Sequence, residues 1–241
     1  MATKKNDNTY KIITPEGTFV WPHLNEPDYG NEAAPAPNGQ YKVTLRLNTS
    51  DEKVKKFLAR LDELMQLAKE QAEEEIEQWS KDAKAKLKTS GGITSDLPYS
   101  QVFDKETGEP TGEVDFTTKM VASGVNSKTK APWKQKPGLF DAKNKPISKG
   151  TEIWGGSTGR VSCSLKPYFI SGTKKYGLSR RLEAAQILSL VTRGQARPAS
   201  SYGFDEQEGF DSSELLKDED DTANEAHIEE TEYDEDDAAA F

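Results

Sequence analysis

The sequence predicts a mainly β protein: a small antiparallel barrel capped by one long amphipathic helix and followed by a disordered acidic tail. Three observations support this fold class. Period-two alternation of apolar residues recurs along the chain and indicates roughly five to seven half-buried strands. A single segment, 51–88, carries helical spacing. No regular βαβ alternation is present, so a barrel is favoured over a parallel sheet.

The first elements are short. Residues 1–9 are polar and basic, which is typical of a flexible arm. Residues 10–21 predict two short strands around the turn triplet Pro15-Glu16-Gly17. Residues 26–39 are rich in Pro, Gly and Asn, and we expect a loop there.

Residues 40–48 predict a half-buried strand with a basic outer face. Alternate positions are apolar, and the positions between them include Lys42 and Arg46. Period-two spacing of this kind places the two sets on opposite faces of a sheet.

The segment 51–88 predicts one helix. Asp51 suits the positive end of the helix dipole. An apolar stripe with three-and-four spacing runs as far as Trp79, and Ser90-Gly91-Gly92 ends the helix. We expect the stripe to cover one end of a sheet, with a coiled-coil seam as the alternative.

The second half of the chain returns to strand patterning. We expect turns over 91–112, a strand over 113–125 and a long loop over 126–150. A strand pair or one bent strand follows at 151–170, with a possible bulge at Gly155-Gly156. Ser171 to Lys175 predicts a hairpin turn, and the last strand spans 176–191.

Composition excludes several classes of protein. The chain has 241 residues, of which 34% are apolar, and a mean hydropathy of −0.81, so part of it is expected not to fold. Its one cysteine, Cys163, fits a reducing cytoplasm, and two histidines cannot build a Cys/His zinc cluster. No membrane span, secretory signal, catalytic triad or phosphate-cradling loop is apparent, so we expect no cofactor and no enzymatic activity.

Charge divides the chain into two parts. Residues 205–241 hold 17 acidic residues and one basic residue, a net charge of −16, whereas residues 1–204 carry +7. We therefore expect a nucleic-acid-binding domain over 1–197 and a disordered tail over 198–241.

Basic and aromatic residues are interleaved in the domain, which is the combination that single-stranded nucleic acid requires. Residues 119–197 hold 16 bases and three acids. Cations neutralise phosphates and flat rings stack on unpaired bases. The predicted contacts, drawn from this segment and the polar faces before it, are Tyr29, Lys42, Arg46, Trp133, Lys134, Lys136, Trp154, Arg160, Lys166, Tyr168, Phe169, Lys174 and Lys175.

Some of these assignments leave alternatives open. Trp154 suits core packing as well as base stacking, and Tyr29 suits turn packing as well as contact with DNA. At least one of Tyr168 and Phe169 is expected to face outward. A solvated basic strand face is the alternative for Arg46, Arg160 and Lys166.

The acidic tail is the second feature of the sequence that indicates a function. It ends Asp234-Glu235-Asp236-Asp237-Ala238-Ala239-Ala240-Phe241, where a terminal ring and the α-carboxylate form a compact docking element for another protein. Charge alone suggests that the tail occupies the basic groove when nucleic acid is absent and is displaced by it. Simple solubility is the alternative role.

The sequence resembles the phage replication single-stranded DNA-binding proteins of the T7 type. The resemblance rests on Glu26-Pro27-Asp28-Tyr29-Gly30-Asn31 followed by Gly39-Gln40-Tyr41-Lys42-Val43, and on the position of the helix. It also rests on the stretch from Gly155-Gly156-Ser157 to Ser164-Leu165-Lys166-Pro167-Tyr168 and on the acidic tail ending in Phe241.

This resemblance implies an OB-fold that binds single-stranded DNA in phage replication, recombination and repair, in the cytoplasm of the infected bacterium. It also implies a tail that recruits DNA polymerase and other replication proteins, a homodimer formed through the tail, and strand annealing. The groove aromatic maps onto Tyr168 and the terminal aromatic onto Phe241. The alternatives are an RNA-binding chaperone of OB or cold-shock type and an acidic-tailed interaction scaffold.

Overall fold

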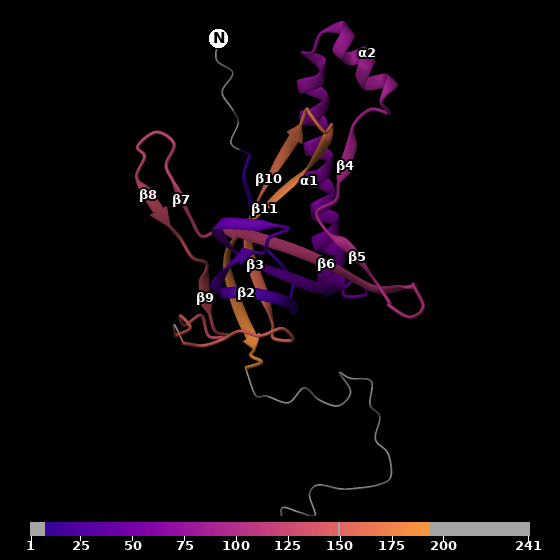
Figure 1. Ribbon diagram of the computed structural model, residues 1–241. Helices are drawn as coiled ribbons and strands as arrows, with labels where there is room; N and C mark the ends of the chain where they lie inside the picture. Colours follow the sequence, from indigo (N-terminus) through magenta and orange to yellow (C-terminus); the bar gives the residue numbers. More distant parts are fainter. Residues whose placement is uncertain (1–7, 149, 193–241) are drawn as a thin grey trace, which may run out of the picture. The chain divides into compact units, whose positions relative to one another are not determined.

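The computed structural model describes residues 8–148 and 150–192. Its centre is a closed barrel of five strands in the order β10–β2–β3–β6–β11, which the pairing of β10 with β11 closes (Figure 1). The five strands are β2 (Gly17–Gly30), β3 (Pro35–Asn48), β6 (Pro110–Val121), β10 (Thr158–Ile170) and β11 (Lys175–Ser189).

The barrel is mixed. The pairings β2–β3, β3–β6, β10–β11 and β2–β10 are antiparallel, whereas β6 and β11 run parallel where Lys119 lies opposite Arg181. The predicted fold class, a small OB-like barrel with a long helix, is confirmed, with this one parallel junction as an addition.

Short strands extend the barrel strands. β1 (Tyr10–Ile13) pairs with β10, and β5 (Ser100–Phe103) pairs with β6. β4 (Thr94–Asp96) and β9 (Gly138–Phe140) each run parallel to β11. β7 (Ser123–Val125) and β8 (Pro132–Lys134) form a separate hairpin, which projects from the barrel in Figure 1.

The inward positions of each barrel strand build the core. Val43, Leu45 and Leu47 are fully buried on β3, and Phe116 of β6 lies opposite Leu45. The residues between them point outward, so the period-two reading of this strand is confirmed. The strand order therefore decides which outward side chains become neighbours.

The helix α1 (Glu52–Glu77) packs its apolar stripe against β10 and β11. Asp51 caps it, because its Oδ1 accepts a hydrogen bond from the Lys53 amide at 2.7 Å. The ring of Phe57 meets Phe116 edge to face, with centroids 5.2 Å apart. Within the described residues, no helix is long and apolar enough to cross a membrane.

The predicted single helix over 51–88 is wrong in one respect, since the structure has two helices. α2 (Lys81–Thr89) follows α1 after a break at Gln78–Ser80. Ser80 adopts an extended backbone and its hydroxyl accepts from the Ala83 amide, so it caps a new helix. A serine that competes for backbone donors explains why apolar spacing alone missed the break.

Loops were predicted too widely in three places. β2 and β3 reach into 26–39 as far as Gly30 and Pro35, because a tight turn tied by Asp28 and Asn31 side chains joins them. Short strands β4, β5, β8 and β9 interrupt the predicted loops over 91–112 and 126–150. By contrast, 151–157 is not a strand, and β10 begins only at Thr158.

Candidate nucleic-acid interface

A row of cations crosses the outer face of the barrel. Lys42 on β3 lies opposite Lys119 on β6, and Lys119 lies opposite Arg181 on β11. Their neighbours along the strands, Val43 and Met120, point into the core. Like charges placed side by side repel one another, so this row stabilises the barrel poorly but suits a polyanion. We call Lys42, Lys119 and Arg181 the basic row.

Carboxylates on the same face pair with some of the predicted cations. Lys42 Nζ lies 2.5 Å from Asp28 Oδ2, and the pKa of Asp28 is lowered mainly by this hydrogen bond. Arg46 holds Asp115 through two hydrogen bonds of 2.9 Å. Lys119 has no ion pair within residues 8–148 and 150–192, so it is the exposed charge at the centre of the row.

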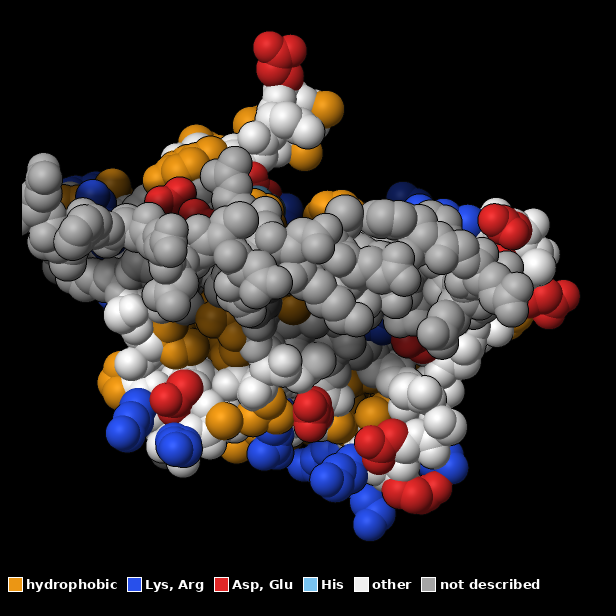
Figure 2. Space-filling view, turned by 90° about the horizontal axis from the view of Figure 1, so that it is seen from below, with side chains coloured by type: hydrophobic (Ala, Val, Ile, Leu, Met, Phe, Trp, Pro, Cys, Tyr) orange, Lys and Arg blue, Asp and Glu red, His pale blue; other side chains and the backbone are white. Residues whose placement is uncertain are grey.

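The face seen in Figure 2 is similarly mixed. Figure 2 shows Lys and Arg side chains along the lower margin of that view, with acidic and hydrophobic side chains between them. A binding face on this protein is therefore identified by local geometry and not by a uniform positive potential.

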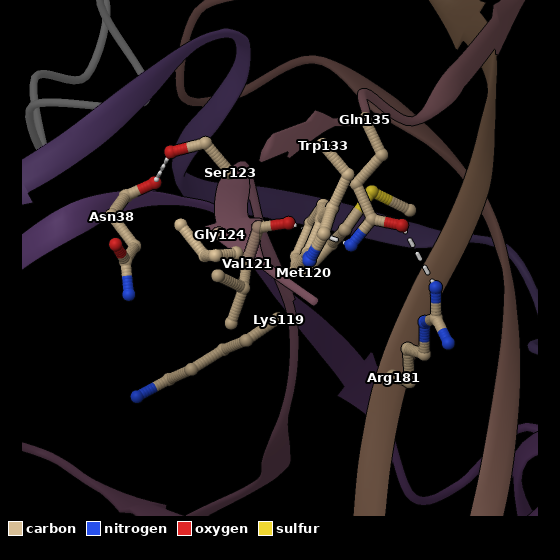
Figure 3. Close-up of a pocket in the computed structure, with 10 residues that line it drawn as sticks. Asn38, Lys119, Met120, Val121, Ser123, Gly124, Trp133, Gln135 and Arg181 are labelled. Carbon is tan, nitrogen blue, oxygen red and sulfur yellow. Dashed lines mark hydrogen bonds between the residues drawn. The ribbon is translucent and has the colours of Figure 1, made fainter. Parts of the chain in front are cut away.

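One pocket of about 600 Å³ lies on one side of Lys119 (Figure 3). Its lining includes Asn38, Val121, Trp133, Gln135 and Arg181. The Gln135 side chain accepts a hydrogen bond from Arg181 at 2.8 Å and donates one to the Val121 carbonyl at 2.7 Å. These two hydrogen bonds hold the Arg181 guanidinium at the wall of the pocket. Figure 3 shows the Lys119 side chain pointing away from that guanidinium.

The absence of a side chain at Gly124 leaves room for the Trp133 indole beside this pocket. On the β7–β8 hairpin it lies opposite Gly124, where an added Cβ would stand 2.6 Å from Trp133 Cζ2. The indole therefore lies flat across the hairpin and remains 38% exposed. The hairpin base is tied to the barrel because the Ser123 hydroxyl donates to the Asn38 carbonyl at 2.8 Å.

A second pocket of about 250 Å³ lies on the other side of Lys119. It is lined by Thr117, Lys119, Tyr168, Leu178, Ser179 and Arg180. Here too a glycine lies under the ring, since a Cβ on Gly177 would stand 3.0 Å from Tyr168 Cζ. Lys166 lies opposite Ser179 on the same face.

The Tyr168 phenol is held in its neutral form. Burial and then its hydrogen bond to the Asp96 carboxylate raise the pKa of Tyr168 to about 12. A neutral ring beside the basic row presents an aromatic face without a negative charge that would repel phosphate.

Other predicted residues lie elsewhere. Phe169 packs on Trp79 in the break between α1 and α2, with ring centroids 6.0 Å apart, and Lys174 donates to the Ser90 hydroxyl. A turn joins β10 to β11 as predicted for 171–175, but it is one residue shorter, because Lys175 is already the first residue of β11. The exposed side chains of Lys134 and Lys136 flank Gln135 beside the first pocket.

Three predicted residues belong to the β2 side of the barrel. Arg160 lies near the start of β10 and donates to the Thr14 carbonyl at 3.2 Å. Trp154, 43% exposed, lies in the segment before β10. Tyr29 is 61% exposed at the end of β2, beside Gly39. The tail residues Asp234, Glu235, Asp236, Asp237 and Phe241 lie outside the described residues.

The sequence reasoning did not select Lys119, Arg180 or Arg181 as site residues. The signal for Lys119 was present, since it alternates with the apolar positions of its strand. For Arg180 and Arg181 the strand pattern is interrupted by a register shift in the β10–β11 pairing between Ser162 and Cys163. Only the structure shows that Arg181 lies beside Lys119.

Comparison with known proteins shows two similar phage proteins. The chain is 29% identical over 218 residues to the single-stranded DNA-binding protein of Enterobacteria phage T3, covering 89% of this chain and 91% of the relative. It is 27% identical over 177 residues to that of Escherichia phage T7, covering 71% and 72%. Both relatives are named as single-stranded DNA-binding proteins.

The fold has a matching crystal structure. That of gp2.5, a single-stranded DNA-binding protein encoded by bacteriophage T7, superposes with a TM-score of 0.59 at 24% identity, covering 84% of this chain and 98% of that one. Residues 18–190 also match the family described as "Single-stranded DNA-binding protein, Bacteriophage T7". The match spans the whole barrel and its helices, and the chain therefore belongs to this family of T7-type phage single-stranded DNA-binding proteins.

Proposed function

We propose that this phage single-stranded DNA-binding protein holds the unpaired strand across the outer face of β10, β11 and β6, with Lys119 at the centre. Phosphates contact Lys119, Arg181 and Lys166, while Trp133 and Tyr168 stack on bases. One observation carries the proposal: the exposed cation Lys119 lines both pockets, and each pocket holds one of the two rings.

The chemistry of the face favours a single strand over a duplex. Base–aromatic stacking contributes ~1–3 kcal/mol per base and is possible only when the base is unpaired. A duplex would present phosphates to the basic row, but it would leave Trp133 and Tyr168 without partners. Stacking is also tolerant of sequence, because every base has a π-face.

The central residue gives the most direct test. Lys119→Ala removes one phosphate contact, so it should weaken binding and lower the salt slope by roughly 0.7 in log–log units. Tyr168→Ala should cost ~1–3 kcal/mol of binding free energy. The assay is fluorescence anisotropy with a labelled oligonucleotide at several salt concentrations. Wild-type affinity and slope in both variants would reject this face as the binding site.

The alternative function is that of an RNA-binding chaperone, whose ligand is RNA and not DNA. The stacking face itself does not read a 2′-hydroxyl, whereas family membership favours DNA. Competition between single-stranded DNA, single-stranded RNA and duplex DNA decides between them. Tighter binding of RNA than of DNA of equal length would contradict the proposal.

The acidic tail is proposed to act in two ways. Residues 198–241 carry the charge to compete with DNA for the basic face, and the terminal Asp234–Asp237 and Phe241 element is suited to recruiting DNA polymerase and other replication proteins. Support comes from the net charge of −16 over 205–241. We also expect a homodimer formed through the tail, acting in replication, recombination and repair in the infected bacterial cytoplasm.

Deleting residues 205–241 tests the competition. The shortened protein should bind single strands more tightly, and part of the salt dependence should disappear. Unchanged affinity would reject it. Removing Phe241 alone should abolish polymerase stimulation and leave DNA binding intact, whereas stimulation that survives would reject recruitment by the tail end. A scaffold without DNA-binding function would show no affinity for single strands with or without the tail.

A further inference from the structure

Trp21 is an exposed tryptophan in a backbone conformation that tryptophan rarely adopts. Its indole is 80% exposed and its φ is +49°, in the left-handed region. Bulky residues at positive φ are outliers, and such strain persists mainly at functional sites. Pro22 follows directly, which ordinarily favours an extended backbone at residue 21. An indole in water gains little packing, so stability does not account for a tryptophan here.

A β-bulge places Trp21 on the barrel surface. Val20 of β2 pairs with Thr44 of β3, and His23 pairs with Lys42, so two residues of β2 lie opposite the single residue Val43. Bulges of this kind redirect a side chain and are frequent next to binding sites. The bulge therefore explains how the indole of Trp21 projects from the strand.

Trp154 lies beside this bulge on the neighbouring segment. Residues 151–157 run along β2: the Phe19 amide donates to the Ser157 carbonyl at 2.8 Å, and the Ile153 amide donates to Asn25 Oδ1 at 3.1 Å. A Cβ on Gly155 would stand 3.9 Å from the Trp21 amide nitrogen. The two tryptophans therefore belong to adjacent segments of one surface.

Alternation along the same segment turns Trp154 outward. Ile153 and Ser157 are buried, whereas Trp154 is 43% exposed. Its Nε1 donates to Glu152 Oε2 at 3.1 Å, which holds the indole in place. A held, half-exposed ring loses little conformational freedom when a base stacks on it.

Trp21 and Trp154 lie beyond the Lys42 end of the basic row. Going across the strands, Arg181 lies opposite Lys119, Lys119 opposite Lys42, and Lys42 opposite His23 of β2. Each step is ~4.8 Å, so His23 is about 14 Å from Arg181 around the barrel. That distance corresponds to about four nucleotides at the ~3.4 Å spacing of a stacked strand. A strand crossing Lys119 in this direction would next reach Trp21 and Trp154.

We propose that Trp21 and Trp154 form a second stacking station for the same single strand, beyond Lys42 on the β2 side of the barrel. The inference rests on the proposed path across Lys119. The ionisable side chains flanking the two rings are His23 and the carboxylate Glu152, so the station contacts bases and not phosphates. It therefore adds affinity for long strands with little salt dependence.

The experiment compares oligothymidylates of roughly 4 and roughly 20 nucleotides: the shorter covers no more than the distance from Arg181 to His23, and the longer exceeds the usual span of one OB-fold. Full-length wild-type protein is compared with Trp21→Asn, Trp154→Ala, their double variant, and Lys119→Ala. Asparagine tolerates positive φ, so it removes the ring without adding strain. Trp21→Phe is the matched control that keeps a stacking ring.

We expect the double variant to bind the long oligonucleotide about tenfold more weakly, since stacking is lost at one or two bases. Its affinity for the short oligonucleotide, its salt slope and its melting temperature should stay at wild-type values, and Trp21→Phe should retain most of the affinity. Lys119→Ala should weaken binding of both lengths and lower the slope.

The outcomes separate the two proposals. Wild-type affinity of the double variant for the long oligonucleotide, together with a defect in Lys119→Ala, would overturn the second station and leave the proposed binding face standing; the tryptophan surface would then serve another protein. Equal losses for both lengths would also overturn a separate station. A normal Lys119→Ala variant would instead overturn the proposed path itself.

Discussion

Gly124 offers a way to move Trp133 without removing it. A Cβ at position 124 would lie 2.6 Å from Trp133 Cζ2 and 2.9 Å from Cε2, closer than carbon atoms tolerate. Gly124→Ala must therefore lift the indole from the hairpin. The backbone at Gly124 has no positive φ, so alanine fits there without strain. The obstacle is a side chain on a projecting hairpin, and we expect the barrel to keep its stability.

The magnitude follows from the stacking contribution. If Trp133 stacks on one base, its displacement forfeits at most ~1–3 kcal/mol, and each 1.4 kcal/mol is tenfold in affinity. We therefore expect Gly124→Ala to weaken binding of single-stranded DNA by about tenfold, less than or equal to the loss in Trp133→Ala. The assay is anisotropy titration, with thermal melting to confirm that the fold is intact.

Gly172 supplies the matched control. It lies in the β10–β11 turn, has no positive φ, and an added Cβ there meets nothing within 4 Å. Gly172→Ala should bind like wild type. If Gly124→Ala also binds like wild type while Trp133→Ala is impaired, the flat placement of the indole on the hairpin is not what binding requires. If both bind normally, Trp133 is not part of the site.

Three further predictions concern the Arg46–Asp115 ion pair, the Tyr168 phenol and the core. Asp115→Asn should release the Arg46 guanidinium from its two 2.9 Å hydrogen bonds, tighten DNA binding and raise the salt slope by up to one phosphate's worth, ~0.7; an unchanged slope in a salt titration would show that Arg46 does not reach DNA. The folded-state pKa of Tyr168, about 12, lies above the ordinary value of 10.0, so the neutral phenol stabilises the fold fully below pH 10 and this contribution is lost as pH rises towards 12. Denaturant titrations should show a smaller loss over that window in Tyr168→Phe than in wild type, and equal losses would contradict the assignment. Leu61→Ala in α1 should lower the free energy of unfolding by ~2–5 kcal/mol because its side chain is fully buried, while the folded fraction should bind DNA normally; reduced affinity in the folded fraction would mean that α1 contributes to the site.

The barrel was predictable from sequence because each of its strands shows its inward face. On β3, Val43, Leu45 and Leu47 alternate with polar residues, and the structure buries all three. Period-two spacing specifies which side chains point out, and this identified Lys42 and Arg46 as outward residues. It contains no information about which strand lies next to which.

The pairing of the strands determines which partners these outward residues have. Asp115 lies opposite Arg46 only because β3 and β6 pair in one particular register, and Asp28 reaches Lys42 from β2. In the sequence these residues are far apart or belong to a segment read as a loop. Charge counts over a segment therefore overestimated the cations available to DNA.

The parallel junction of β6 and β11 was equally invisible in the sequence. It rests on one pair of residues, Lys119 and Arg181, which are separated by two strands and a hairpin along the chain. Local patterning predicts strands but not a contact made by closure of the barrel. The centre of the proposed site arises from that closure, so its central pair of residues was also the pair least predictable from the sequence.

The balance of charge on this face has a consequence for how tightly DNA is held. Two outward cations, Lys42 and Arg46, are already paired with carboxylates, so DNA must either leave them paired or replace an existing partner. Fewer counterions are then released than the number of lysines and arginines suggests, and the salt slope should be shallow. Affinity in such an arrangement depends more on rings than on charges. A strand held mainly by stacking on rings such as Trp133 and Tyr168 can be released one base at a time, because each stacked base contributes its own ~1–3 kcal/mol.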